Sequence, residues 1–467
     1  MHRRALLLAL ALLAIPATAE AADYAGHVSV RSWLEGDYDI REDFRYKVRQ
    51  LRYDGEAGGS SRLSVRFGAA GRAVFTDPGG VEARGGCVQR RRTRVACRAR
   101  GRSPGFEPAA LFVLGDGNDV LALRGISKNG ATLVRAGEGD DAIAGSPAAD
   151  LIYGGAGADR LRGRGGADSF AGGATPDGAD RISGGDQADE VDYSSRTGAV
   201  HADLEGDADD GEAGELDAIG ASVERLQGGF GADELLGDGR ANRLRGGGGP
   251  DVLRAGDGDD RLVAAGGSTL DAGAGDDVLR SYGGPAVLEP GLGRDAVSDE
   301  DETAASSIAA RDGEVDEIVC RGTNDGATVD APDMVAGCSA IARDGAPAGR
   351  LLFALAYYGG LAGPPSSRRL WWDSYERDVG FTLGCPLDMG ARCELRVELR
   401  RGGRTLLRMR AGLDAGALGE FDGRLTRREF RAVRGKPVTA RIETTNRDGA
   451  AVLQRERVRV LRVPSYG

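Results

Sequence analysis

The stretch GGAGADRLRGRGGADSF, from Gly154 to Phe170, carries the pattern on which the fold of this chain rests. Asp159 and Asp168 lie nine residues apart, and a large apolar residue follows each of them two places later. Aligned on the aspartate, the unit reads GGxGxDxUx, where U is large and apolar. A packed core does not need so many glycines, and a catalytic site does not usually occur in copies. The pattern therefore indicates a repeated structural unit.

Each unit predicts a tight turn followed by a short strand. Glycine adopts positive φ without Cβ strain, so the first six residues can form a turn whose carbonyl groups converge. The last three residues form a strand whose middle side chain points inward. One unit buries almost nothing, so several units must stack to bury a common ladder of Leu, Ile, Val and Phe.

Copies of the unit recur through the centre of the chain. The best copies have their aspartate at Asp159, Asp233 and Asp251. Close copies place the aspartate at Asp119, Asp141, Asp168, Asp260, Asp277 and Asp295. Weaker copies contain Asp150, Asp180 and Asp189, and an amide replaces the carboxylate at Asn242.

Stacking brings these side chains together. Two nine-residue units make one coil, so residues eighteen apart share an edge, about 4.8 Å apart. Carboxylates at that spacing repel one another unless a cation lies between them. Clustered carboxylate and carbonyl oxygens suit Ca²⁺ better than Mg²⁺. The predicted stacked pairs are Asp141 with Asp159, Asp150 with Asp168, Asp233 with Asp251, Asn242 with Asp260, and Asp277 with Asp295.

The repeats resemble the hemolysin-type calcium-binding repeats of the repeats-in-toxin family, over about 111–192 and 228–298. The resemblance implies a parallel β-roll, with Ca²⁺ as the bound ion and a metal-binding role for each aligned Asp and for Asn242. A Gly-rich linker is the alternative, but a linker would not keep Leu or Ile two places after each Asp. An empty β-solenoid without calcium also remains an alternative.

We expect an all-β protein, a parallel β-roll solenoid flanked by small β domains. Residues 1–19 combine a basic start, a short apolar run and small residues before the cleavage point, which predicts a signal peptide and a secreted, extracellular protein. The apolar run is too short to span a membrane, so we expect no membrane insertion. The domains beyond it are a β domain at 20–110, the roll at 111–305 with an insertion at 193–227, a disulfide-closed cap at 306–346, and a β-sandwich at 347–467.

All six cysteines lie in the mature chain in close pairs, and an oxidising destination favours local disulfides, although six cysteines allow other connectivities. A zinc site is the weaker interpretation, because no CxxC occurs and only His27 and His201 remain after processing. We interpret both histidines as strand residues. The predicted disulfides are Cys87–Cys97, Cys320–Cys338 and Cys385–Cys393.

Charge is distributed unevenly along the chain, whose net charge is −11, and the acidic excess lies in the Gly-rich centre. Within the insertion, the acidic loop EGDADDGEAGELD is no EF-hand, because Gly206 and Ala208 stand where acidic ligands are needed. An arginine cluster near residues 90–102 predicts a solvated hairpin or a surface for an anionic cell-wall polymer. No aromatic residues interleave it, so we expect no nucleic acid partner.

Two functional hypotheses follow. The sequence has neither HExxH nor GxSxG, which excludes a metalloprotease of that type and the usual lipase elbow. The first hypothesis is a secreted non-enzymatic calcium-binding protein that folds on binding Ca²⁺, with flanking β domains that adhere to a cell-surface polymer or glycan. The alternative is a divergent extracellular enzyme that acts on polysaccharide.

Overall fold

The structure is a computed structural model that describes most residues between 26 and 344 and a set of strands beyond 368. The predicted signal peptide, residues 1–19, and Cys385 of the third predicted disulfide lie outside the described residues. The described ranges are 26–36, 45–56, 58–68, 72–98, 110–125, 131–322, 324–330, 333–344, 369–372, 378–384, 393–401, 404–413, 418–424, 431, 437–445 and 451–462.

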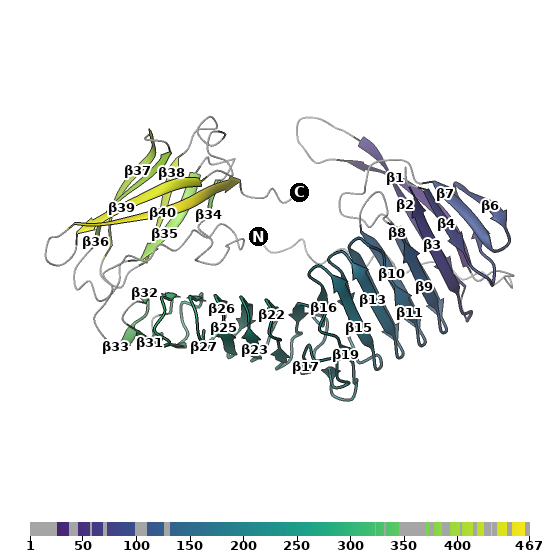
Figure 1. Cartoon of the computed structure of the whole chain (residues 1–467), viewed down its shortest axis with the longest axis horizontal. Helices are drawn as coiled ribbons and strands as arrows, with labels where there is room; N and C mark the ends of the chain where they lie inside the picture. The colour runs from purple at the N-terminus through teal and green to yellow at the C-terminus, as the bar shows by residue number, and fades with distance from the viewer. Residues whose placement is uncertain are drawn as a thin grey trace.

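The centre of the chain is a parallel β-roll, as predicted, with two faces and a shared interior (Figure 1). One face is a single fifteen-stranded sheet, sheet A, which runs along the whole roll. In spatial order its strands are β5 (Glu82–Ala83), β1 (Gly26–Gly36), β2 (Arg45–Gly55), β8 (Ala110–Asp116), β10 (Thr132–Glu138), β12 (Asp150–Ala156), β14 (Ser169–Ala171), β16 (Glu190–Asp192), β20 (Arg225–Gln227), β22 (Arg243–Arg245), β24 (Arg261–Ala265), β26 (Val278–Tyr282), β28 (Ala296–Asp299), β30 (Glu317–Cys320) and β32 (Met334–Ala336).

The other face is divided into two nine-stranded sheets, sheet B and sheet C. Sheet B contains β6 (Cys87–Arg91), β7 (Arg94–Arg98), β4 (Arg72–Thr76), β3 (Arg62–Gly68), β9 (Val120–Arg124), β11 (Ala142–Ala144), β13 (Arg160–Gly165), β15 (Arg181–Asp186) and β19 (Ala218–Ile219). Sheet C contains β18 (Gly211–Glu212), β17 (Val200–Ala202), β21 (Glu234–Leu236), β23 (Val252–Asp257), β25 (Thr269–Ala274), β27 (Val287–Glu289), β29 (Ser307–Ala310), β31 (Gly326–Asp330) and β33 (Ala340–Asp344).

The core is a ladder of apolar residues, most of them two places after the Asp, Glu or Asn at the start of the strand. Leu226, Leu244 and Leu262 stack in register on sheet A, and each is fully buried. Leu235 and Leu253 do the same on sheet C. Each such side chain contributes about 1.5–3 kcal/mol of burial free energy, so the stack as a whole, rather than any single coil, stabilises the roll.

The N-terminal strands extend this stack. Strand β2 pairs in parallel with β8, and β3 pairs in parallel with β9, so the region before residue 110 adds strands to both faces. Its core is continuous with that of the roll: the Phe75 and Phe112 rings lie 6.2 Å apart between centroids. Antiparallel partners β1, β4, β6 and β7 then close this end, and the Cys87–Cys97 disulfide joins β6 to β7 as predicted.

The insertion at 193–227 leaves sheet A intact and interrupts the other face. Strand β16 pairs directly with β20, because Glu190 lies opposite Arg225. The residues between them supply β19 to the end of sheet B, and β17 and β18 to the start of sheet C. The roll is therefore continuous along one face only.

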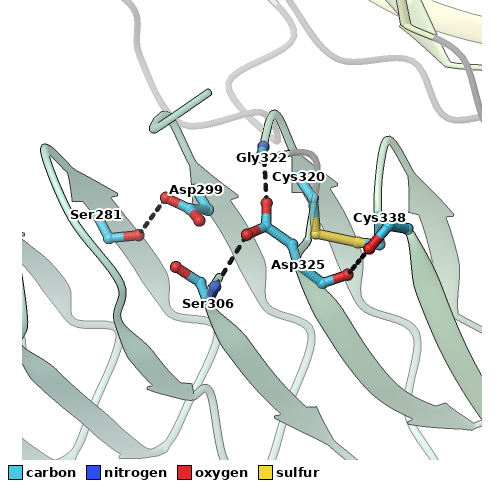
Figure 2. The surroundings of a disulfide bond; sticks show 8 residues. Ser281, Asp299, Ser306, Cys320, Gly322, Asp325 and Cys338 are labelled. Carbon is cyan, nitrogen blue, oxygen red and sulfur yellow. Dashed lines mark hydrogen bonds between the residues drawn. A yellow bond between two sulfur atoms is a disulfide. The ribbon is translucent and has the colours of Figure 1, made fainter. Parts of the chain in front are cut away.

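The C-terminal end of the roll is closed by the predicted Cys320–Cys338 disulfide, which joins the last residue of β30 to the segment that follows β32 (Figure 2). Strands β29 to β33, within the predicted cap at 306–346, continue the two sheets in the same register pattern. The cap is thus built from further coils of the roll.

The described strands of residues 347–467 form a separate seven-stranded sheet, and the predicted β-sandwich at this end stays a prediction. Its edge strands β37 and β38 also approach each other, so the sheet is curled. Among the described residues, none belongs to a helix with the length and apolar character needed to cross a membrane. In spatial order the strands are β37 (Arg404–Leu413), β36 (Cys393–Arg401), β39 (Pro437–Thr445), β40 (Ala451–Arg462), β34 (Arg369–Trp372), β35 (Asp378–Gly384) and β38 (Leu418–Arg424).

Stacked turns need glycine where one backbone lies directly on the next. Gly155 has a φ of +102°, and a β-carbon there would lie 2.0 Å from the carbonyl oxygen of Gly137. Gly155→Ala should therefore lower the free energy of unfolding by at least about 1–2 kcal/mol, the cost of the left-handed backbone alone. Urea unfolding measures this loss. Gly239→Ala is the control, because Gly239 has no atom within 4 Å of its β-carbon position, and an equal loss in both variants would contradict the prediction.

Candidate calcium-binding edges

The aspartates of the repeats stand where the strands of each sheet begin, and they form three columns. Edge A, at the starts of the sheet A strands, consists of Asp150, Asp168, Asp189, Glu224, Asn242, Asp260, Asp277, Asp295, Asp316 and Asp333. Edge B, along sheet B, consists of Asp119, Asp141, Asp159, Asp180 and Asp217. Edge C, along sheet C, consists of Asp233, Asp251, Ser268, Ser306 and Asp325.

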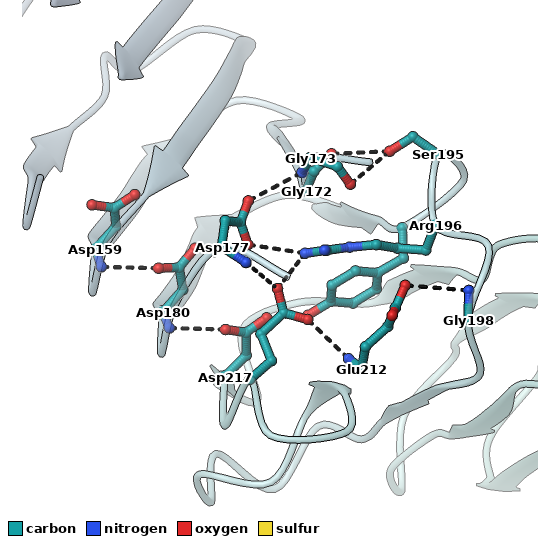
Figure 3. Close-up of polar contacts among 12 residues, drawn as sticks. Asp159, Gly172, Gly173, Asp177, Asp180, Ser195, Arg196, Gly198, Glu212 and Asp217 are labelled. Atoms are coloured by element: carbon teal, nitrogen blue, oxygen red, sulfur yellow. Dashed lines mark hydrogen bonds and ion pairs between the residues drawn. The ribbon is translucent and has the colours of Figure 1, made fainter. Parts of the chain in front are cut away.

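One oxygen of each carboxylate is used to join neighbouring coils. On edge B, the Asp141 backbone N–H donates to Asp159 Oδ1 at 2.8 Å, and the Asp159 N–H donates to Asp180 Oδ1 at 2.9 Å. The Asp180 N–H in turn donates to Asp217 Oδ1 at 2.8 Å (Figure 3). Every stacked pair predicted from the spacing of eighteen is linked in this way.

The second oxygen of most of these carboxylates is buried without a hydrogen-bond donor. A buried oxygen that lacks a donor costs about 1–3 kcal/mol, and more when it is charged. Such an oxygen needs a cation or a proton. The Oδ2 atoms in this state belong to Asp119, Asp141, Asp159, Asp168, Asp189, Asp251, Asp260, Asp277, Asp295 and Asp316.

Backbone carbonyl groups converge on the same space. A β-carbon built on Gly163, the residue five places before Asp168, would lie 2.0 Å from Asp168 Oδ2 and 2.8 Å from the carbonyl oxygen of Gly184. Glycine at this position therefore keeps open a space bounded by a carboxylate and the carbonyl group of the next coil. An oxygen-only donor set with several negative charges fits a hard cation such as Ca²⁺.

Burial favours the protonated form of these carboxyl groups. Loss of solvation and, to a smaller extent, neighbouring carboxylates together raise the pKa of Asp168 and of Asp295 to about 8. The same causes raise the pKa of Asp141 and of Asp159 to about 7. A proton and a cation are thus alternative ways to neutralise an edge.

This geometry defines a calcium-binding β-roll. The sequence model of the RTX calcium-binding nonapeptide repeat, in four copies, matches residues 132–174, 177–195 and 236–268. The chain therefore carries RTX calcium-binding nonapeptide repeats, and Ca²⁺ is the ion that such repeats bind. A comparison with curated protein sequences finds no match to the chain.

All the predicted metal ligands lie in the three columns, but they are not equivalent. Asp150 and Asp233 have both carboxylate oxygens hydrogen-bonded: Ser146 N–H donates to Asp150 Oδ2, and Gly229 N–H donates to Asp233 Oδ2 at 2.6 Å. Asn242 directs its Oδ1 to the Asp238 N–H at 2.7 Å and offers a buried amide NH₂ in place of a ligand oxygen. The metal-binding role of each residue remains a prediction.

Sequence reasoning missed several members of the columns because their turns lack the glycines. Asp217, Asp316 and Asp333 each take the aspartate position of a coil. Each is followed two places later by a buried Ile or Val, so the short pattern Asp-x-apolar would have located them. Glu224 replaces Asp on edge A, where its Oε2 accepts the Asp189 N–H at 3.0 Å.

The last aspartate of edge C needs no cation. Asp325 Oδ1 accepts the Ser306 N–H at 2.9 Å, and Asp325 Oδ2 accepts the Gly322 N–H at 2.8 Å (Figure 2). Both oxygens are therefore satisfied by backbone donors next to the Cys320–Cys338 disulfide. Backbone donors therefore satisfy Asp325 at this end of edge C.

A buried arginine supplies the positive charge where edge B ends. Arg196 is fully buried, and its Nη2 pairs with Asp177 Oδ1 at 2.9 Å and with Glu215 (Figure 3). Its guanidinium lies 5.9 Å from the centroid of the Tyr193 ring, whose hydroxyl donates to Asp217 Oδ2 at 2.8 Å. This cluster ties the insertion to the roll through charges that belong to the chain.

Arg196→Met should remove the counterion of two acidic groups at this junction. Breaking a buried pair in this way typically costs about 3–5 kcal/mol, so the urea midpoint in saturating calcium should fall sharply. Arg254→Met is the matched control, since Arg254 pairs with Glu234 at 2.7 Å on the surface and should contribute about 0–1 kcal/mol. Similar midpoints for the two variants would contradict this role.

The calcium-free roll should be more stable at acid pH. The folded-state pKa values of about 7 to 8 exceed the unfolded value of about 3.9, so the folded roll binds more protons between these limits. The stability that these carboxyl groups contribute is then fully present below about pH 4 and is lost as the pH rises toward 8. Far-UV circular dichroism of metal-stripped protein at pH 5 and pH 8 measures this loss as a fall in the folded fraction. Saturating calcium should abolish or reverse the difference, and a calcium-free roll that is more stable at pH 8 would refute the prediction.

Proposed function

We propose that this protein is a secreted, non-enzymatic calcium-binding protein whose Asp/Gly roll folds when Ca²⁺ binds. The observation that carries the proposal is the column of buried carboxylate oxygens without donors, repeated along edges A and B. The match to calcium-binding nonapeptide repeats indicates that the cation is Ca²⁺. The candidate N-terminal signal peptide supports secretion, and the two disulfides fit an oxidising compartment.

Folding and ion binding are coupled because the site exists only in the stacked coils. Asp159 and Asp180 are twenty-one residues apart in sequence, yet Asp180 Oδ1 lies 2.9 Å from the Asp159 backbone nitrogen in the fold. In a calcium-poor cytosol, repulsion between ionised carboxylates opposes stacking and leaves the repeats loose for export. Calcium at about 10⁻⁴–10⁻³ M, the range typical of extracellular modules, would then drive folding outside.

The flanking β regions are the proposed adhesive parts. The disulfide-closed hairpin β6–β7 presents Arg90, Arg91 and Arg94 as exposed side chains at one end of the roll. An exposed basic edge suits an anionic cell-surface polymer or glycan. The same charges also protect an edge strand from pairing with other chains.

Removal of one column aspartate tests the central proposal. Asp159→Ala and Asp251→Ala should each lower the number of calcium ions bound and raise the calcium concentration that half-folds the protein roughly tenfold or more. The loss of a hydrogen bond to a charged group, about 1.5–3 kcal/mol, alone accounts for that factor. Equilibrium dialysis counts the ions, and far-UV circular dichroism follows folding in a calcium titration, with magnesium as the ion control.

Asp257→Asn is the matched protein control, because Asp257 is an exposed acid on β23 outside the three columns. It should leave both the ion count and the folding midpoint unchanged. A wild-type protein that is fully folded in chelator, or an unchanged calcium count in both alanine variants, would refute the coupling of calcium to folding.

A further inference from the structure

The insertion places a histidine among carboxylates that are not members of the calcium columns. His201 in β17, Asp203 just after it, and Asp209 in the loop before β18 bring one ligand atom each within 4.8 Å of one another. The antiparallel pairing of β17 with β18, in which His201 lies opposite Gly211, brings the two sides of this loop together. None of the three residues belongs to edge A, B or C.

The imidazole is oriented for metal binding. Its Nε2 faces the cluster, 3.9 Å from Asp203 Oδ2, while its Nδ1 lies 3.4 Å from Glu234 Oε2 on the neighbouring strand β21. A histidine that ligates a metal commonly holds its other ring nitrogen against a carboxylate, which fixes the ring and its tautomer. Glu234 is thus placed as a positioning residue outside the cluster.

The loop is held in place by contacts that leave its outward ligand atoms available. The Asp203 backbone N–H donates to Asp210 Oδ1 at 2.6 Å, and Asp203 Oδ1 accepts the Glu205 N–H at 2.8 Å. Asp203 Oδ2 is the atom turned toward His201. Asp209, at the far side of the loop, is exposed and can approach the other two.

We propose that His201, Asp203 and Asp209 bind a divalent transition-metal ion, of which Zn²⁺ is the representative. Imidazole nitrogen suits zinc and other first-row transition metals, whereas Ca²⁺ takes oxygen ligands. Ligand atoms of tetrahedral zinc stand roughly 3.3 Å apart, as bonds of about 2.0 Å require, so the loop must close slightly around the ion. Three protein ligands leave one position for water.

The proposed ion has a structural consequence at the start of sheet C. Strand β17 is the second strand of this sheet and lies between the two-residue edge strand β18 and strand β21. An ion that joins Asp203 and Asp209 would clamp the hairpin loop to β17. The site goes beyond the proposed calcium-dependent function, since it uses a different ion and different residues.

The test is a zinc titration of the full mature protein in saturating calcium, which occupies the column sites first. Isothermal calorimetry should report one additional Zn²⁺ ion, and Co²⁺ in its place should give visible absorption bands. After removal of residues 1–19 the sequence contains only His27 and His201, so imidazole nitrogen signals in NMR identify which ring binds. The His201 signals alone should shift.

Variants separate this site from general binding. His201→Ala and Asp209→Asn should each weaken zinc binding about tenfold or more, and Glu234→Gln should weaken it while one ion still binds. Matched controls are His27→Ala and Asp207→Asn, an exposed acid in the same loop, which should bind zinc as the wild type does. Circular dichroism in calcium checks that each variant is folded. Equal zinc binding by Asp209→Asn and Asp207→Asn, no zinc binding by the wild type, or displacement of zinc by millimolar calcium would overturn the proposal.

Discussion

The whole structure depends on one constraint: in a parallel roll with regular coils, each residue stacks on its own counterpart about 4.8 Å away. For Leu244 and Leu262 this stacking is favourable, because identical apolar side chains bury one another. For Asp141 and Asp159 the same stacking is unfavourable, because it brings like charges together in a site that excludes water. The core and the ion-binding edges are therefore two results of one periodicity.

The chain neutralises the stacked charges in several ways. Along edges A and B the proposed Ca²⁺ ions would neutralise the carboxylates, whereas backbone N–H groups satisfy Asp325 and a guanidinium pairs with Asp177 and Glu215. Serine replaces aspartate at Ser268, whose hydroxyl accepts the Asp251 N–H at 2.9 Å without adding charge. Where the repeat is interrupted, groups of the protein itself therefore neutralise or replace the stacked carboxylates.

The same stacking brings positive charges together on the outer face of sheet A. Arg225, Arg243 and Arg261 stack in register on β20, β22 and β24. Partial burial, and then the nearby Arg280 and Arg243, lower the pKa of Arg261 to about 10. Parallel stacking amplifies any charge that the repeat carries, whichever its sign.

The sequence predicted the repeat geometry because the period is local. Asp159 and Asp168 with their apolar followers were enough to predict strands, stacking and a calcium-binding edge, and the eighteen-residue pairs are confirmed by the hydrogen bonds. Asp217 escaped prediction because it follows Asp180 by thirty-seven residues, a separation that depends on how the insertion folds. Arg196 escaped it because its partners Asp177 and Glu215 meet only through that same excursion. The parallel pairing of β3 with β9 likewise joins residues nearly sixty apart, and no local pattern records it.

The insertion gives the two sides of the roll different degrees of continuity. Edge A passes it without a gap, since Glu224 accepts the Asp189 N–H and the Glu224 carbonyl accepts the Arg243 N–H at 2.8 Å. Edge B ends at Asp217, within the insertion, and edge C begins at Asp233, after it. In a solenoid each coil is stabilised mainly by its neighbours, so order spreads only along an unbroken stack. Ions bound along edge A can therefore order the roll from end to end, whereas those on edges B and C order one half each, and the charges around Arg196 hold the junction between the halves.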